Sequence, residues 1–108
     1  MINKDRLQQA LTYLAETDEE CGKLRADHAR AEFKAKSINK TIFKNITNGS
    51  IADRQAEADT DEVYFQAKQA EFDAFFKYES MKNKRITQTI IVDVWRSLNA
   101  GRNKGQII

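Results

Sequence analysis

The 108 residues include no proline and only 4 glycines, 41% of them are hydrophobic and 31% charged, and the formal net charge is +2. So few turn-forming residues exclude a β-sandwich or a β-barrel, because the tight turns of those folds depend on glycine and proline. With a mean hydropathy of −0.69, much of each helix contacts water unless a second chain covers it, so we expect a single all-α domain that oligomerises.

The first predicted element is a helix over residues 4–48. Apolar and small residues recur in it at spacings of three and four, which is the pattern of a coiled-coil seam. Asn3 is placed to cap its N-terminus. The two columns of the seam are Leu7, Leu14, Cys21, His28, Ala35 and Ile42, and Ala10, Thr17, Leu24, Ala31 and Ile38. Many of these residues are small or polar, which predicts close but weak packing.

A turn is predicted at residues 48–50. Gly49 can adopt the left-handed conformation that ends a helix, and Ser50 followed by Asp53 forms a capping box for a second helix. That helix is predicted over residues 51–100, with a flexible basic tail at 101–108 after the helix-stopping Gly101. The polar segment Lys82–Arg85 is a second place where the helix could bend or break.

Folding the chain back at Gly49 predicts a long antiparallel helical hairpin, in which residue i lies near residue 98 minus i. In this register, residues of opposite charge face each other at both ends of the hairpin. The basic residues Arg30, Lys34, Lys36, Lys40 and Lys44 face Asp53, Glu57, Asp59, Asp61 and Glu62, and the acidic residues Glu16, Asp18, Glu19 and Glu20 face Lys77, Lys82, Lys84 and Arg85. The same pairing could form between two chains.

The second predicted helix has two apolar stripes on nearly opposite sides. One stripe consists mainly of small residues and suits close contact with the first helix; it contains Ala56, Thr60, Val63, Ala67, Ala70, Ala74 and Met81. The other stripe needs a second copy of the chain, so we expect a dimeric four-helix bundle. The candidate dimer interface is Phe65, Phe72, Phe76, Ile90 and Val94, together with Trp95 near the end of the helix.

No motif in the sequence indicates catalysis, a cofactor or a metal. There is no phosphate-binding glycine loop and no nucleophile elbow, and the carboxylates are spread over helix faces. One cysteine, Cys21, and one histidine, His28, cannot supply the four ligands of a structural zinc site within one chain. We therefore expect no enzyme activity, and we interpret both residues as part of the seam.

The basic residues of the second helix are candidates for contact with nucleic acid or with a protein. Several lie near aromatic residues, as on surfaces that bind single strands. The candidates are Lys77, Lys82, Lys84, Arg85, Arg96, Arg102 and Lys104. The net charge of +2 is smaller than nucleic-acid binding domains usually carry, so we favour a protein partner. Arg54 is a further candidate contact at the turn, because a cation at a helix N-terminus is unfavourable without a partner.

Four segments resemble small all-helical proteins encoded in the early region of temperate tailed bacteriophages. These segments are NGSIADRQAEA (Asn48–Ala58), the periodic helix Val63–Tyr78, the basic step Lys82–Arg85, and VWRSLNAGR (Val94–Arg102). The resemblance covers roughly residues 34–102. It implies a helical protein encoded near recombination and single-strand-annealing genes, and it supplies no active site.

From the residues and this resemblance, we expect a non-enzymatic phage accessory protein that binds another protein, on phage or host machinery for DNA recombination or repair. Two alternatives stay open: direct nucleic-acid binding through the basic end of the second helix, and a structural spacer or scaffold. The start of the chain lacks the apolar core of a secretory signal, and no apolar run could span a membrane. We therefore expect a location in the cytoplasm of the host bacterium.

Overall fold

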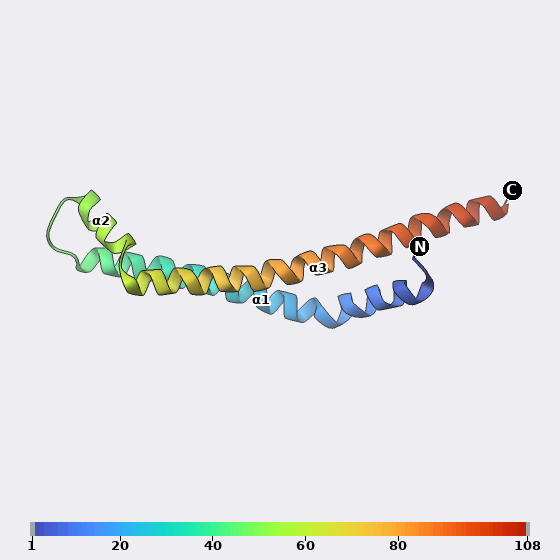
Figure 1. The fold of residues 1–108 in the computed structure, drawn as a ribbon, viewed down its shortest axis with the longest axis horizontal. Coiled ribbons are helices and arrows are strands. Elements are labelled where there is room, and N and C mark those ends of the chain that lie inside the picture. The colour runs from blue at the N-terminus through green and yellow to red at the C-terminus, as the bar shows by residue number, and fades with distance from the viewer. Residues whose placement is uncertain (1, 108) are drawn as a thin grey trace. The chain divides into compact units, whose positions relative to one another are not determined.

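The computed structural model describes the backbone of residues 2–107 and the side chains of residues 2–101. This part of the chain contains three helices and no strand: α1 (Lys4–Asn45), α2 (Ile51–Asp59) and α3 (Glu62–Ile107) (Figure 1). The predicted all-α class is therefore confirmed. None of the helices, within the residues described, combines the length and apolar composition needed to span a membrane.

Polar side chains cap the first two helices, as the sequence predicts. Asn3 Oδ1 accepts a hydrogen bond of 2.8 Å from the Arg6 backbone N–H at the start of α1. Ser50 Oγ accepts one of 3.1 Å from the Asp53 backbone N–H at the start of α2. In the connection between α1 and α2, Gly49 has a φ of 100°, a conformation that glycine adopts without steric cost. α1 ends at Asn45, before the predicted limit at residue 48.

The prediction of one helix over residues 51–100 is wrong, because the helix breaks between α2 and α3. At the end of α2, the Thr60 backbone N–H and the Thr60 hydroxyl both donate to the Ala56 carbonyl, at 3.2 and 2.9 Å. Asp61 Oδ1 then accepts a hydrogen bond of 2.8 Å from the Val63 backbone N–H. Short polar side chains compete in this way with helical hydrogen bonds, so a helix can end without glycine or proline.

The helix does not break at the two places where the sequence suggests an end or a bend. α3 is continuous through Lys82–Arg85 and past Gly101 to Ile107. Gly49 is the one described glycine with positive φ, so Gly101 stays helical, which costs about 1 kcal/mol relative to alanine. The predicted boundary at residue 100 is therefore wrong. The side chains of the predicted basic tail, from Arg102 onward, lie outside the described residues.

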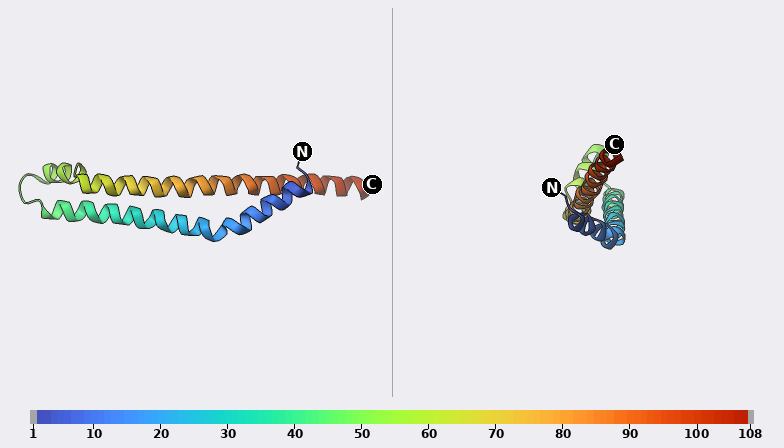
Figure 2. Two further views of the ribbon diagram at one scale, coloured as in Figure 1. Left: turned by 60° about the horizontal axis from the view of Figure 1, so that its bottom comes forward. Right: turned by 90° about the vertical axis from the view of Figure 1, so that its right-hand side faces the viewer.

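The chain divides into two compact units. Unit 2 comprises residues 23–78, and unit 1 comprises residues 1–22 with 79–108. In unit 2, the α1 and α3 segments run antiparallel as a helical hairpin, and α2 lies in the connection between them (Figure 2). In unit 1, the first part of α1 runs antiparallel to the second part of α3, with Arg85 bonded to Leu14 and Thr17.

The seam that the sequence predicts in α1 is confirmed, since every one of its positions is buried or half-buried. The predicted small-residue stripe is only partly correct: Ala67, Ala74 and Met81 are covered, whereas Ala56, Thr60, Val63 and Ala70 are exposed. Most covered positions of α3 instead repeat every seven residues in two columns. These columns are Tyr64, Glu71, Tyr78, Arg85, Val92 and Asn99, and Ala67, Ala74, Met81, Gln88 and Trp95.

The hydrophobic core is thin. Among the described residues, no large side chain is fully buried, and the buried apolar residues are Ala10, Ala35, Ala58, Ala67 and Val92. Small residues bring helix backbones close together but remove little apolar area from water. Much of the apolar surface of this chain therefore remains exposed.

Candidate protein-binding surface

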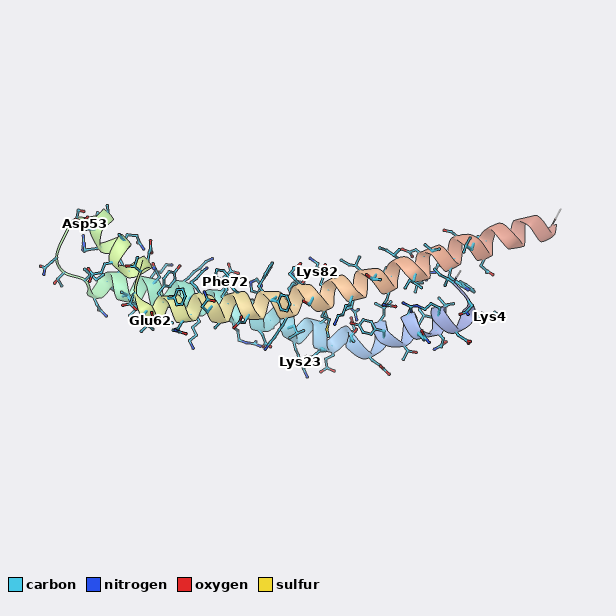
Figure 3. All side chains as sticks on the ribbon, viewed as in Figure 1. Lys4, Lys23, Asp53, Glu62, Phe72 and Lys82 are labelled. Atoms are coloured by element: carbon cyan, nitrogen blue, oxygen red, sulfur yellow. The ribbon has the colours of Figure 1, made fainter. Side chains whose placement is uncertain are left out.

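The clearest candidate site is an aromatic patch on α3, which we define as Phe65, Phe72, Phe75 and Phe76. Their exposed fractions are 52%, 52%, 46% and 70%. Phe65, Phe72 and Phe76 occupy helix positions on the side of α3 that points away from the α3 seam. Phe75 lies at the edge of that seam. Figure 3 shows the α3 segment around Phe72, within unit 2. Single exposed apolar residues are normal, but three aromatic rings on one helix face, with a fourth at the edge of the seam, indicate a surface that another molecule covers.

An ion pair between a buried carboxylate and a half-buried ammonium borders the aromatic patch. Glu71 is 7% exposed, and its carboxylate forms an ion pair with the Lys68 ammonium. Lys68 Nζ also lies 5.1 Å from the centroid of the Phe72 ring, in a cation–π arrangement. The hydrogen bond to Glu71 raises the pKa of Lys68 above its ordinary value. These contacts hold the Lys68 side chain against the patch and satisfy its charge within the chain.

Two further contacts lie on the α1 side of unit 2. The His28 and Phe75 ring centroids are 5.1 Å apart, and His28 is half-buried, so its place in the seam is as predicted. On the neighbouring turn, Lys36 Nζ donates to Glu32 Oε1 at 3.1 Å. This hydrogen bond lowers the pKa of the Glu32 carboxyl. The first contact joins α1 to α3, and the second lies within α1.

A polar cluster that sequence reasoning missed attaches α2 to α1. Asn39 Nδ2 donates to Asp59 Oδ1 at 2.8 Å, and Gln55 Nε2 donates to the same oxygen at 2.7 Å. Gln55 Nε2 also lies 3.0 Å from Asn39 Oδ1. Ala58, also on α2, is fully buried. This cluster was not predicted from the sequence, because one continuous helix was predicted over residues 51–100. Only the break after Asp59 allows α2 to lie against α1.

Arg54, the candidate contact at the turn, is engaged within its own unit. Its guanidinium carbon lies 5.4 Å from the centroid of the Phe43 ring, and its Nε donates to the Ser50 carbonyl at 3.4 Å. The side chain is half-buried. Stacking on an aromatic face therefore accommodates this cation at the start of α2.

In unit 1, the aliphatic candidates Ile90 and Val94 are exposed, together with their neighbours Ile86 and Leu98. Trp95 differs from the other interface candidates because it is half-buried at a seam position. With Ile2, Leu98 and Asn99, Trp95 lines a hollow of only about 10 Å³. It therefore belongs to the seam rather than to the exposed stripe.

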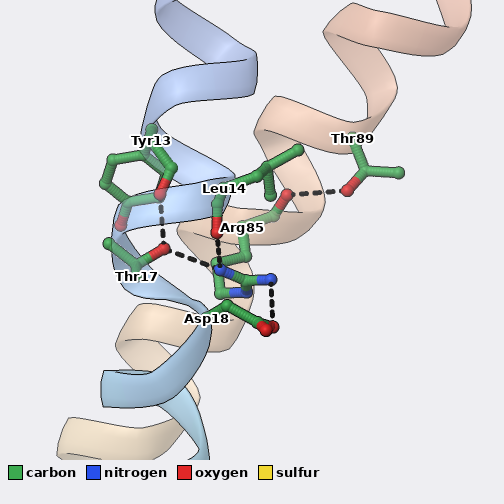
Figure 4. A network of polar contacts seen from close by, with 6 residues as sticks. All are labelled: Tyr13, Leu14, Thr17, Asp18, Arg85 and Thr89. Carbon is green, nitrogen blue, oxygen red and sulfur yellow. Dashed lines mark hydrogen bonds and ion pairs between the residues drawn. The ribbon is translucent and has the colours of Figure 1, made fainter.

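Arg85, a candidate phosphate contact, is occupied within unit 1. Its Nη1 donates to the Leu14 carbonyl and to Thr17 Oγ1, each at 2.7 Å, and its Nη2 lies 3.2 Å from Asp18 Oδ1 (Figure 4). The side chain is 21% exposed. The Arg85–Asp18 pair has the predicted signs, but the predicted register places Thr17 near Met81.

The other basic candidates differ in what surrounds them. Lys82 Nζ lies 3.8 Å from Glu79 Oε1 on the same helix. Lys77, Lys84 and Arg96 are exposed, and Lys77 belongs to unit 2 whereas the other two belong to unit 1. The side chains of Arg102 and Lys104 lie outside the described residues. The described side chains therefore supply fewer available cations than the sequence suggests.

A shallow apolar groove lies between α1 and α3 in unit 2. Two adjoining hollows of about 280 and 390 Å³ form it, and both are lined by Lys34, Ile38 and Val63. On α3, Val63 and Ala70 occupy helix positions on the opposite flank of the seam from the aromatic patch. Unit 2 thus presents apolar surface on two sides.

Comparisons with known proteins identify no relative. No protein-family model, no curated protein and no solved structure matches the chain. Within the described residues, no group of three or more histidine, cysteine or acidic side chains is placed to hold a metal ion. The candidate site therefore consists of the exposed apolar surface and the charges around it.

Proposed function

We propose that this chain is a non-enzymatic accessory protein that acts by binding another protein, and that it does so as a homodimer with four long helical segments. The observation that carries the proposal is the contrast between its alanine-dominated core and its exposed aromatic patch. A chain whose large apolar side chains stay in contact with water gains free energy when another protein covers them.

The free energy available from the patch is substantial for a small domain. Full burial of a phenylalanine side chain contributes about 1.5–3 kcal/mol, so covering four half-exposed rings contributes about 4 kcal/mol. Small domains have only about 5–15 kcal/mol of net stability. Association through the patch would therefore stabilise the fold as well as form the complex.

The resemblance to early-region phage proteins directs the choice of partner. We propose phage or host components of DNA recombination or repair as the proteins that this chain binds, in the cytoplasm of the infected bacterium. The nucleic-acid alternative has less support, because Arg85 already donates to Leu14, Thr17 and Asp18. A spacer with no ligand would leave the exposed rings without a role.

Affinity capture tests the proposed function. Tagged protein is used as bait in lysates of phage-infected and uninfected cells, with and without nuclease, and retained proteins are identified by mass spectrometry. We expect a retained protein that nuclease treatment does not remove. Loss of every retained protein with nuclease, together with nucleic-acid binding that weakens steeply with salt, would favour the nucleic-acid alternative.

A matched pair of bait variants separates a specific surface from general stickiness. Phe76→Ser changes a ring of the aromatic patch, whereas Phe33→Ser changes an even more exposed ring on α1, at 73% exposed. We expect Phe76→Ser to reduce recovery of the partner and Phe33→Ser to retain it. Equal recovery with both variants would show that the patch has no part in binding.

A further inference from the structure

A charged side chain lies at each end of the aromatic patch. Glu62 precedes Phe65 on α3, Lys77 directly follows Phe76, and both charged side chains are exposed. At about 100° per residue, Glu62 and Lys77 lie on the same flank of the patch. On this flank the patch therefore has the Glu62 carboxylate at its N-terminal end and the Lys77 ammonium at its C-terminal end, with the exposed Asp73 one turn before Lys77.

The two charged residues have different surroundings within the chain. Glu62 Oε1 accepts a hydrogen bond of 2.8 Å from Gln66 Nε2, which holds the carboxylate on this flank. Lys77 makes no ion pair within the part of the chain that the structure describes. In contrast, Lys68 on the other flank is already paired with Glu71. Lys77 is thus the cation beside the patch whose charge a second molecule can balance.

An antiparallel second copy matches both the rings and the charges. A two-fold axis at Ala70 places Phe65 within one residue, about 1.5 Å, of the level of Phe76 of the second copy, because the two residues lie five and six positions from Ala70 along α3. The same axis places Glu62, eight positions from Ala70, within one residue of the level of Lys77 of the second copy, seven positions from it, and the symmetry repeats both contacts. A parallel arrangement would instead place Glu62 beside Glu62 and Lys77 beside Lys77, which is unfavourable.

We propose that two copies of this chain associate antiparallel through the aromatic patch, with reciprocal Glu62–Lys77 ion pairs that set the orientation. This inference rests on the proposed function, since it specifies the homodimer through which the chain acts. The rings supply the affinity, and the exposed ion pairs select the antiparallel over the parallel arrangement.

The size of the patch sets the expected strength of the dimer. A whole aromatic side chain buries roughly 200 Å², so the four half-exposed rings of two copies bury about 900 Å² together. Stable interfaces bury about 1,200–2,000 Å², which is more than the area that the rings bury. Side chains next to the patch add some area to the interface. We therefore expect a dimer that dissociates on dilution through the micromolar range.

Sedimentation equilibrium over a concentration series tests the surface. We expect Phe76→Ser to weaken dimerisation at least tenfold, and Phe33→Ser on α1 to leave it within twofold of the unchanged protein. Circular dichroism of each variant at the same concentration checks that the helices are retained. Equal effects of the two variants, or a monomer at every concentration, would overturn the inference.

A charge-exchange series tests the orientation while leaving every ring in place. In the antiparallel arrangement, Glu62→Lys alone and Lys77→Glu alone each replace attraction by repulsion, so both weaken dimerisation by a factor of about three to ten. The double variant Glu62→Lys/Lys77→Glu restores attraction, and we expect it to dimerise like the unchanged protein. In a parallel arrangement, the unchanged protein, the two single variants and the double variant all have like charges side by side and dimerise equally. Equal dimerisation of these four proteins would overturn the inference.

The two proposals fail on different results. A dimer that is insensitive to the charge-exchange series overturns the antiparallel arrangement, whereas recovery of a protein from infected cells still supports protein binding. If the charge-exchange series behaves as expected and no lysate protein is retained, the proposed function is wrong and the antiparallel dimer stands.

Discussion

Arg85 Nη1 on α3 lies 2.7 Å from the backbone carbonyl oxygen of Leu14 on α1. The same nitrogen also donates to Thr17 Oγ1, whose hydroxyl donates in turn to the Tyr13 carbonyl. An arginine at a seam position thus joins two helices where most seams have apolar side chains. Because its donors match acceptors at one point along α1, Arg85 fixes the register of unit 1.

Substituting Arg85 tests this role. We expect Arg85→Met to lower the free energy of unfolding by about 1–3 kcal/mol, because hydrogen bonds to a charged group are lost at a half-buried position. Urea unfolding followed by circular dichroism measures the change. Lys84→Met is the matched control, since Lys84 is exposed on the same turn, and it should stay within about 0.5 kcal/mol of the unchanged protein. Equal stability of the two variants would show that the Arg85 contacts do not set the register.

Two glycines provide a prediction with opposite signs. Gly49 has a φ of 100°, and a Cβ added there would lie 3.3 Å from Asp53 Cβ, so Gly49→Ala should destabilise the protein by about 1 kcal/mol or more. Gly22 lies inside α1, and an added Cβ would meet nothing within 4 Å. Gly22→Ala should therefore stabilise the protein by about 0.5–1 kcal/mol. Thermal unfolding of both variants checks the two signs, and a shift in the same direction for both would contradict the assigned conformations.

The sequence predicts α1 well because one side of that helix is both apolar and covered. Its seam can be followed from Leu7 to Ile42 by spacing alone, although several members are small or polar. The aromatic patch was also predictable, since Phe65, Phe72 and Phe76 repeat at helical spacing. In both cases the periodicity of apolar residues carries the information.

The seam of α3 could not be found from apolar periodicity, because apolar residues in this helix are shared between a covered side and an exposed one. Glu71, Arg85 and Gln88 occupy covered positions, whereas Phe76 and Ile90 are exposed. Arg85 was therefore grouped with the available cations near it. The spacing of seven residues from Tyr78 to Arg85 to Val92 is the one signal in the sequence that indicates its place in the seam.

Alkaline pH should test the ion pair between Lys68 and Glu71. The hydrogen bond to Glu71 raises the pKa of Lys68 above its ordinary value of 10.5 in the folded protein. The folded state then binds this proton more tightly than the unfolded state, so the pair contributes its full stability below pH 10.5 and loses it as the pH rises through the folded-state pKa. Beyond that pH, Glu71 is a buried carboxylate without its cation.

The measurement is the free energy of unfolding at several pH values from 9 to 12, for the unchanged protein and for Lys68→Met. We expect the difference between the two proteins to shrink as the pH rises through this range. Lys84→Met serves as the control and should keep the pH dependence of the unchanged protein, because Lys84 is exposed. A constant difference for Lys68→Met across the range would contradict a raised pKa of Lys68.

The docking of α2 on α1 is tested by two alanines of the same helix. Ala58 is fully buried, so Ala58→Leu forces extra methyl groups into a closed space and should destabilise the protein by about 1–3 kcal/mol. Ala56 is exposed, and Ala56→Leu should change stability by less than about 0.5 kcal/mol. Hydrogen exchange of the α2 amides localises the effect, since loss of docking should speed exchange over Ile51–Asp59 before the rest of unit 2. If α2 exchanges at the same rate in both variants, the helix is not held in place by the burial of Ala58, and the cluster of Asn39, Gln55 and Asp59 holds it instead.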